Sequence, residues 1–217
     1  MPDQTLHASL SQEGFLHDVP HIRRSLDHLL ETDPVFSNID TDFSDFPWPH
    51  FAGGFPGLVR IVIGQQISTS AAASLWNKMF TRIEPLTPEN LLKQNDDILR
   101  DIGLSRQKQS YVRGLARAIL DGECDPSGFK DLEDEEIKTR ITSLKGFGDW
   151  SANIYLLFCL ARPDVWPAGD LGIQLGLQDY LELDEKPDAK RTAEEGKRFK
   201  GHRSAASLLM WHLKSQK

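Results

Sequence analysis

Apolar positions recur at intervals of three and four along most of this chain, the spacing typical of amphipathic helices. One such helix opens at Pro20, carries Ile22, Leu26 and Leu29 on one face, and ends at Pro34. No two segments alternate apolar and polar residues in the way that a convincing pair of strands would. The pattern therefore predicts an all-α protein.

Further helices follow from capping residues and apolar spacing. Thr87-Pro88-Glu89 supplies an N-cap and a proline in the first turn, and this helix is expected to end at Gly103. Ser105 begins another, which runs to Gly122 with Tyr111, Leu115, Ile119 and Leu120 facing inward. The remaining predicted helices cover 70–83, the stretch containing Ile137, Ile141 and Leu144, the nearly all-apolar and hence buried segment 149–161, and 203–213.

Two parts of the N-terminal third lack this spacing. Residues 1–19 show no periodicity and are predicted to be a flexible lead. Residues 34–57 mix proline, glycine and aromatic residues, which indicates an irregular but anchored loop. The apolar, β-branched run 58–63 is compatible by propensity alone with a strand.

Composition excludes several classes of protein. The 217 residues are enough for one large or two small domains with a core. The sequence contains no run of 18 apolar residues, so no membrane span is expected. The first residues do not resemble a signal peptide. The two cysteines, Cys124 and Cys159, indicate a reducing compartment and are too few for a four-cysteine iron–sulfur cluster. The seven histidines show no metal-ligand spacing.

The net negative charge of the chain comes from its first 50 residues, because residues 51–217 hold equal numbers of acidic and basic residues. The formal net charge is −7, and residues 1–50 alone hold nine acidic and two basic residues. Residues 100–117 hold five basic residues against one acidic, and 186–217 hold nine against three. Local positive charge is what attracts phosphate, although either cluster is also compatible with an ordinary solvated helix face.

Residues 144–170 carry the most informative motif. Leu144-Lys145-Gly146-Phe147-Gly148-Asp149-Trp150-Ser151-Ala152 is a Gly-x-Gly turn that opens a helix, whose free N–H groups and dipole form a seat for an anion. Trp166-Pro167-Ala168-Gly169-Asp170 places a carboxylate 22 residues after Gly148. Asp170 is compatible with a helix N-cap, with a catalytic carboxylate, or with both.

Taken together, these motifs resemble the helix-hairpin-helix DNA glycosylases, and most closely the 3-methyladenine DNA glycosylase II branch. The resemblance covers roughly residues 50–215. Its other landmarks are Gly64-Gln65-Gln66-Ile67-Ser68, Gly103-Leu104-Ser105, and Phe199-Lys200-Gly201-His202-Arg203-Ser204 leading to Trp211, where Gly201 replaces the usual proline.

The resemblance implies two helical subdomains with a cleft between them, and no iron–sulfur cluster. It also assigns 58–63 to a helix. Residues 20–217 would form a single glycosylase domain, with central helices over roughly 58–160 and the second subdomain built from 20–57 and 161–217. Such a protein is expected to act as a monomer on double-stranded DNA with a damaged base, in the cytoplasm at the bacterial nucleoid or in a eukaryotic nucleus.

The resemblance also assigns roles to individual residues. Asp170 would be catalytic, and Gly146, Gly148, Lys145 and Phe147 would hold DNA at the hairpin. Gln65 and Gln66 would reach the minor groove, or would instead cap a helix or form a buried hydrogen bond. Leu104 or Arg106 would fill the gap left by the flipped base, although Leu104 is equally compatible with the core. No cofactor is required, but the carbonyls of Thr142, Leu144 and Phe147 would hold a structural Na⁺ or K⁺ ion.

Aromatic residues at the family's pocket positions are Trp211 and Trp150, with Tyr155 nearby. An electron-rich pocket would attract a cationic alkylated base, whereas the alternative for each tryptophan is ordinary packing in the core. Bifunctional relatives carry a lysine nucleophile where this chain has Trp150, so we expect a monofunctional enzyme that leaves an abasic site. The alternatives are a non-catalytic module that binds distorted DNA and a glycosylase for another damaged base.

Overall fold

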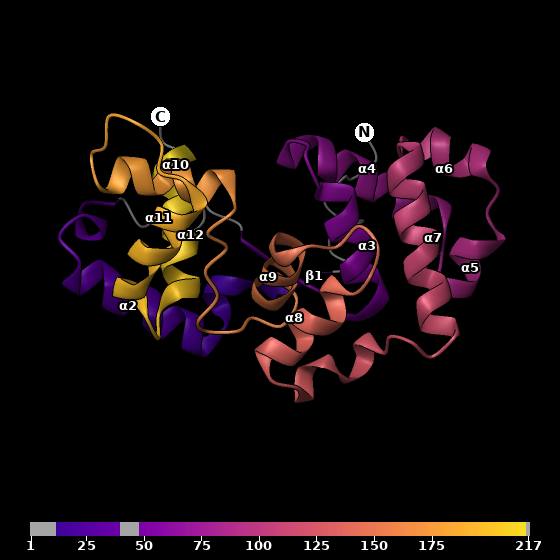
Figure 1. The fold of residues 1–217 in the computed structure, drawn as a ribbon, viewed down its shortest axis with the longest axis horizontal. Helices are drawn as coiled ribbons and strands as arrows, with labels where there is room; N and C mark the ends of the chain where they lie inside the picture. The colour runs from indigo at the N-terminus through magenta and orange to yellow at the C-terminus, as the bar shows by residue number, and fades with distance from the viewer. Residues whose placement is uncertain (1–11, 40–47, 216–217) are drawn as a thin grey trace. The chain divides into compact units, whose positions relative to one another are not determined.

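A computed structural model of the protein, which describes residues 12–39 and 48–215, is mostly helical (Figure 1). Short strands β1 and β2 pair as a two-stranded sheet. The elements in chain order are β1 (Gln12–Phe15), η1 (Leu16–Asp18), α2 (Pro20–Thr32), η2 (Phe36–Asn38), β2 (Pro49–Phe51), α3 (Gly54–Gly64), α4 (Thr69–Arg82), α5 (Pro88–Lys93), α6 (Asp96–Ile102), α7 (Arg106–Leu120), η4 (Pro126–Asp131), α8 (Asp134–Thr142), α9 (Asp149–Phe158), α10 (Leu171–Tyr180), α11 (Ala189–Glu195), η5 (Gly196–Phe199) and α12 (Arg203–Ser215).

The chain divides into two compact units. One is built mainly from Phe51–Tyr155, and the other from Gly14–His50 together with Leu156–Lys217. The chain passes from the first unit to the second within α9. The all-α fold expected from the apolar spacing is confirmed, and the run 58–63 is helical, as the resemblance implied.

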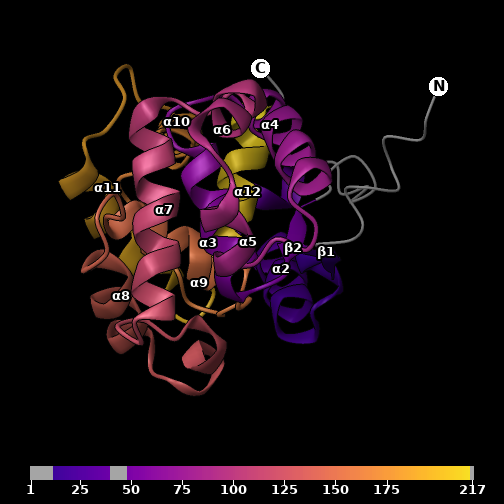
Figure 2. The same ribbon diagram turned by 90° about the vertical axis from the view of Figure 1, so that its right-hand side faces the viewer.

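The first unit packs around α3, which is apolar on almost every side. Leu58, Val59 and Ile63 are all fully buried. Helix α7 lies along α3 and α5 (Figure 2) and turns its buried face, centred on Val112 and Leu115, toward them. The inward face of α7 therefore differs from the predicted one, because Leu120 is 46% exposed at the end of the helix.

Polar caps set the helix boundaries in this unit. The side chains of Ser68, Thr87 and Ser105 accept hydrogen bonds from the backbone at the starts of α4, α5 and α7. The single helix predicted between Thr87 and Gly103 is wrong. It is two helices, because the side chain of Asn95 caps a new start at α6, where it accepts from the N–H of Ile98 at 2.9 Å.

The second unit is formed by α2, α10 and α12, together with the short elements η1, η2, α11 and η5. Ile22 and Leu26 of α2 are fully buried, as predicted for that helix. Helices α10 and α12 lie side by side (Figure 1) and approach closely at Gly176, where an added Cβ would lie 2.2 Å from the carbonyl oxygen of Met210. Glycine at this position is required by the close approach of the two backbones.

The predicted flexible lead is wrong over its second half. Residues 12–18 form β1 and η1, and Leu16 is fully buried with its N–H donating to the carbonyl of Trp48 at 2.8 Å. Contacts with residues more than thirty positions away hold this segment, so its own periodicity could not reveal it. The first half of the predicted lead, residues 1–11, lies outside the described residues.

Within the described residues, no helix is both long and apolar enough to cross a membrane.

Candidate functional site

The hairpin between α8 and α9 has two glycines with different structural roles. Gly146 has a φ of +92°, and an added Cβ would lie 2.3 Å from Cγ of Tyr111, so both its backbone and its surroundings require glycine. Gly148 is exposed, and an added Cβ would meet nothing within 4 Å. Gly146 is therefore required for the conformation of the turn, while Gly148 leaves the outer surface of the turn free of a side chain.

The neighbouring residues Phe147 and Lys145 also differ in role, because one is buried and the other is exposed. Phe147 is 6% exposed, so its side chain anchors the hairpin in the core and leaves only its backbone for a ligand. The prediction that Phe147 helps to hold DNA therefore applies to its backbone and not to its side chain. Lys145 is exposed and adds a positive charge next to the turn. Helix α9 begins at Asp149, and its first N–H groups have no acceptor within the helix, so the hairpin offers a seat for an anion.

Gln65 ties the loop after α3 to the hairpin. Its Nε2 donates to the carbonyl of Gly146 at 2.8 Å and to Oγ of Ser151 at 3.1 Å. The alternative of a structural hydrogen bond is the one that the structure shows for this residue. Gln66, in contrast, is exposed and has a φ of +58°. A non-glycine residue in this region of backbone space is uncommon and is often found at functional sites.

Lys108 of α7 fixes the same loop from the other side. Its Nζ donates to the carbonyl of Ile63 at 2.7 Å and to that of Gln65 at 2.9 Å. Burial lowers the pKa of Lys108 from its ordinary value. The ammonium group of Lys108 therefore binds the carbonyls at the end of α3 and holds the Gln65-Gln66 turn.

The predicted wedge loop lies between α6 and α7. Gly103 ends α6 with a φ of +107°. Leu104 is 3% exposed, and its carbonyl accepts from Nε2 of Gln109 at 2.8 Å. Leu104 is thus a core residue, which corrects its candidacy as the wedge. Arg106, the first residue of α7, is exposed and remains the candidate.

Asp170 is the N-cap of α10 in the second unit. Its Oδ1 accepts from the backbone N–H of Ile173 at 3.0 Å and from the indole Nε1–H of Trp211 at 2.8 Å. The preceding loop is held by Gln174, whose Nε2 donates to the carbonyl of Ala168 at 3.1 Å. Three separate contacts therefore determine where this half-exposed carboxylate lies and how it is oriented.

Trp211 is placed by both α10 and α9. Its ring lies 5.5 Å from that of Phe158, and an added Cβ at Gly172 would be 2.5 Å from its Cδ1. Gly172 therefore leaves room for the indole beside the first turn of α10. The ring is half-exposed, as a residue that contacts a ligand must be.

The other two predicted pocket residues belong to the first unit and differ from each other. Trp150 is half-exposed in the first turn of α9. Tyr155 is fully buried, its hydroxyl accepts from the N–H of Gly54 at 2.8 Å, and its ring packs edge-on against Phe129. The structure thus places Tyr155 in the core and corrects its assignment to a pocket. Its closeness to Trp150 in sequence had suggested that assignment, but the two residues lie on different faces of α9.

The carbonyls predicted to hold a cation lie at the C-terminal end of α8 and in the hairpin. The carbonyl of Leu144 accepts from the N–H of Phe147 at 3.1 Å and keeps a second lone pair. In the part of the chain that the structure describes, no backbone N–H outside the helices donates to the carbonyls of Thr142 or Phe147. Oxygen atoms of this kind can replace the hydration shell of a monovalent cation, so the three residues fit such an ion. The described residues contain no cluster of three His, Cys, Asp or Glu side chains with metal-binding geometry.

Residues 59–201 match the family described as the HhH-GPD superfamily of base excision DNA repair proteins. DNA-3-methyladenine glycosylase 1 of Schizosaccharomyces pombe is 30% identical over 159 residues, which are 71% of this chain and 69% of the relative. DNA-3-methyladenine glycosylase of Saccharomyces cerevisiae is 27% identical over 203 residues, 86% of this chain and 68% of the relative.

The fold is also similar to solved structures. The Schizosaccharomyces pombe 3-methyladenine DNA glycosylase Mag1 in complex with abasic DNA superposes with a TM-score of 0.74 and 25% identity, over 87% of this chain and 95% of that one.

Proposed function

The chain belongs to the HhH-GPD superfamily of base excision DNA repair proteins, and from this premise we propose that it is a monofunctional DNA glycosylase that hydrolyses the N-glycosidic bond of alkylated bases. Its relatives are named for 3-methyladenine, so the substrate class is the alkylated purines. The observation that carries the proposal is the oriented carboxylate of Asp170, which shares Oδ1 between two donors beside a half-exposed indole.

The reaction requires a carboxylate near the sugar. Departure of the base leaves positive charge on the sugar ring, in a state like an oxocarbenium ion. A carboxylate stabilises that charge best when it is already oriented and needs no rearrangement during the reaction. The N–H groups of Ile173 and Trp211 supply this orientation for Asp170 through one oxygen. Asp170 then stabilises the sugar cation or activates the attacking water.

The leaving group explains the aromatic residues. An alkylated purine that carries a positive charge departs readily, so the protein needs no strong general acid. A cation is attracted to the face of an indole by about 0.5–2 kcal/mol. Trp211 and Trp150 are the half-exposed indoles that we assign to this task.

DNA is held through its phosphates at the hairpin. DNA binding is a property of the family, and the N–H groups at the start of α9 with the open surface at Gly148 suit a phosphate. We assign Arg106 as the wedge that fills the gap when the base is flipped, and the exposed Gln66 as a minor-groove contact.

A monovalent cation would strengthen this grip. The carbonyls of Thr142, Leu144 and Phe147 would hold Na⁺ or K⁺, and the ion would place a positive charge next to the phosphate seat in a chain whose formal net charge is −7. No other cofactor is part of the proposal. The protein would act as a monomer wherever the cellular DNA lies, in the bacterial nucleoid or the eukaryotic nucleus.

The experiment that tests the proposal is incubation of the protein with methylated duplex DNA. Chromatography of the released material then identifies each free base. We expect alkylated purines to be released and the sugar–phosphate backbone to stay intact. A protein that binds the duplex but releases no base would instead be a non-catalytic binding module. Release of only oxidised or mismatched bases from suitable duplexes would move the substrate to another class of damage.

A further inference from the structure

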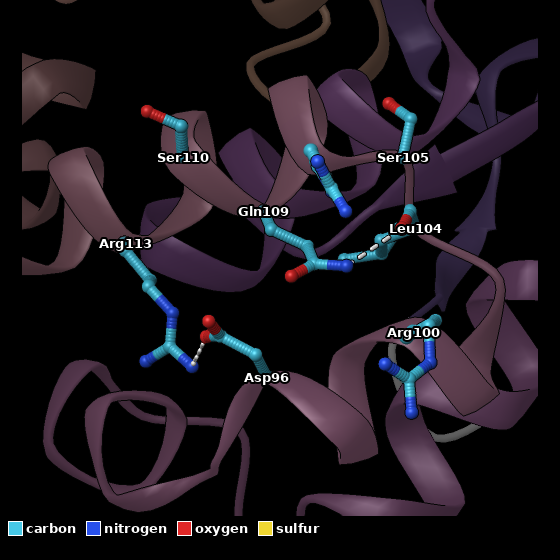
Figure 3. A pocket seen from close by; sticks show the side chains of 8 residues that line it. Asp96, Arg100, Leu104, Ser105, Gln109, Ser110 and Arg113 are labelled. Carbon is cyan, nitrogen blue, oxygen red and sulfur yellow. Dashed lines mark hydrogen bonds and ion pairs between the residues drawn. The ribbon is translucent and has the colours of Figure 1, made fainter.

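A polar pocket of about 690 Å³ lies between α6 and α7, in the first unit (Figure 3). Its lining includes Ser105 and Arg106, of the loop that we assign to the wedge. The hairpin glycines and Asp170 do not line it, so neither the phosphate seat nor the catalytic carboxylate accounts for it.

Three arginines and one carboxylate dominate its wall. Figure 3 shows Arg113 and Arg100 on opposite sides, with Asp96 between them. Arg106 is the third arginine of the lining. A planar guanidinium presents several N–H donors in a fixed fork, which matches the oxygens of a phosphate group.

These arginines are neutralised to different degrees. The NH2 group of Arg113 donates to Oδ1 of Asp96 at 2.9 Å and to the carbonyl of Gln94 at 2.7 Å, so this residue is part of the wall. Arg100 contacts Asp97 at 2.7 Å, but both side chains are about two-thirds exposed, and such a pair contributes little to stability. Arg106 is exposed, and among the described residues it has no ion pair. The pocket therefore keeps an excess of positive charge.

The remaining lining carries no charge. It includes Ser105, the N-cap of α7, and Ser110 of that helix (Figure 3). The Nε–H of Arg113 is buried and has no hydrogen-bond partner in the part of the chain that the structure describes. An unsatisfied buried donor in a pocket wall indicates a missing polar partner, such as an anion or water.

We propose that this pocket binds a phosphate of the DNA backbone where the strand passes the wedge loop. The inference rests on the proposed function, because that function brings a duplex to Arg106. The binding would be independent of base identity, since it uses only phosphate contacts. It would fix the register of the duplex at a second point, apart from the hairpin.

The shape of the pocket favours a backbone phosphate over a free one. Its volume of about 690 Å³ exceeds what one phosphate group fills. Two of its lining side chains are largely open to solvent, with Arg100 70% and Asp96 82% exposed. A pocket built for a small free anion would enclose it, whereas an open one suits a chain that enters and leaves.

The test is the salt dependence of DNA binding, measured by fluorescence anisotropy on a duplex with a stable abasic-site analogue. Each phosphate contact adds about 0.9 to the slope of log K against log salt. We expect Arg100→Gln to lower that slope by about one and to weaken binding by about tenfold at moderate salt, as loss of a charged hydrogen bond does. Thermal melting should stay at the wild-type value, because the Arg100–Asp97 pair is exposed.

Two matched variants separate this effect from general charge and from loss of the ion pair. Arg117→Gln removes the same charge from the neighbouring helix α7, at an exposed position outside the pocket, and should keep the wild-type slope. Asp97→Asn breaks the same ion pair but releases Arg100, so binding should stay equal or become tighter. A loss of slope in Arg117→Gln equal to that in Arg100→Gln would overturn the proposal.

Titration of the protein with inorganic phosphate, followed by NMR of the α6 and α7 amides, distinguishes the two sources of phosphate. Two results together would overturn the DNA assignment in favour of a free anion. The first is saturable chemical-shift changes on addition of phosphate that are lost in Arg100→Gln. The second is a salt slope of DNA binding in Arg100→Gln that equals that of wild type. Failure of the pocket assignment can also be distinguished from failure of the proposed function. If alkylated bases are released while Arg100→Gln keeps the wild-type slope, only the pocket assignment fails. If no base is released while the slope falls, the phosphate site stands and the enzymatic function fails.

Discussion

The indole N–H of Trp211 donates to Oδ1 of Asp170 at 2.8 Å, which joins α12 to the first turn of α10. The same oxygen caps α10 through the N–H of Ile173. The carboxylate that we assign to catalysis is therefore also a structural N-cap. A replacement that keeps the cap but removes the charge can separate the two roles, because asparagine is as good an N-cap as aspartate.

We predict that Asp170→Asn abolishes base release and leaves duplex binding within a few-fold of wild type. The asparagine oxygen can still accept from both donors, so the melting temperature should fall by only a few degrees. The carboxylate acts on charge that develops in the transition state, and its loss should therefore affect turnover and not binding. Single-turnover release of methylated bases and anisotropy on the same preparation measure the two effects.

Asp184→Asn is a suitable control, since it makes the same chemical change at an exposed position of the second unit. It should release bases at the wild-type rate. Turnover near wild type in Asp170→Asn would show that another group stabilises the sugar cation.

The two hairpin glycines should give opposite results when each is changed to alanine. Gly146→Ala places a Cβ at a φ of +92° and against the ring of Tyr111, so we expect the free energy of unfolding to fall by about 2–4 kcal/mol. Gly148→Ala meets nothing within 4 Å, so stability should stay the same. Its methyl group would nevertheless occupy space needed by a phosphate, and DNA binding should weaken by about tenfold, as when one charged hydrogen bond is lost.

Thermal melting and anisotropy distinguish the two variants. If Gly148→Ala binds DNA as wild type does, at low and high salt alike, the hairpin is only a turn between helices. If Gly146→Ala melts at the wild-type temperature, the backbone at this position has adjusted and the close contact with Tyr111 is not essential.

Local signals in the sequence predicted most of the helices and part of the site. Ser105 and Pro88 mark helix starts through their own chemistry, and Asp170 could be identified both as a cap and as a carboxylate within a motif. These features depend on a few neighbouring residues, so they are visible without a fold.

What could not be predicted depends on tertiary contacts. Leu104 and Tyr155 are both buried in the core. The hydroxyl of Tyr155 accepts from the N–H of Gly54, 101 positions away, and spacing along the chain does not show such a partner. The role of Gln65 depends on the contact of its Nε2 with the carbonyl of Gly146, 81 positions away. The arginine pocket is likewise hidden, because Arg100 and Arg113 come together only after α6 and α7 pack.

Lys108→Met should loosen the Gln65-Gln66 turn. The variant loses the donors to the carbonyls of Ile63 and Gln65, so we expect a fall of about 3–8 °C in melting temperature. Lys78→Met, an exposed change on α4, should melt like wild type. DNA binding should also weaken in Lys108→Met, because Gln66 would no longer be held in its exposed turn. Equal melting of the two variants would show that the Lys108 hydrogen bonds do not stabilise the fold.

The same residue predicts a pH dependence. Burial lowers the pKa of Lys108 in the folded state, so the unfolded chain binds this proton more tightly. Stability from this group therefore rises with pH between the lowered value and the ordinary value of about 10.4. The melting difference between wild type and Lys108→Met should grow over that alkaline range, while the difference between wild type and Lys78→Met stays constant. A difference that does not change with pH would mean that Lys108 keeps its ordinary pKa.

The product should be an abasic site, with strand breaks appearing only after alkali or heat. A glycosylase that also cuts the strand uses an amine to form a Schiff base with the sugar, and borohydride traps that intermediate as a covalent adduct. The family resemblance aligns Trp150 with the position where bifunctional members are expected to carry that lysine. The amine of Lys186, in the same unit as Asp170, donates to Oε1 of Gln174 at 2.6 Å. We therefore expect borohydride to trap no adduct during base release from methylated duplex. A stoichiometric adduct would contradict the monofunctional assignment, and its disappearance in either Lys145→Gln or Lys186→Gln would identify the amine that reaches the sugar.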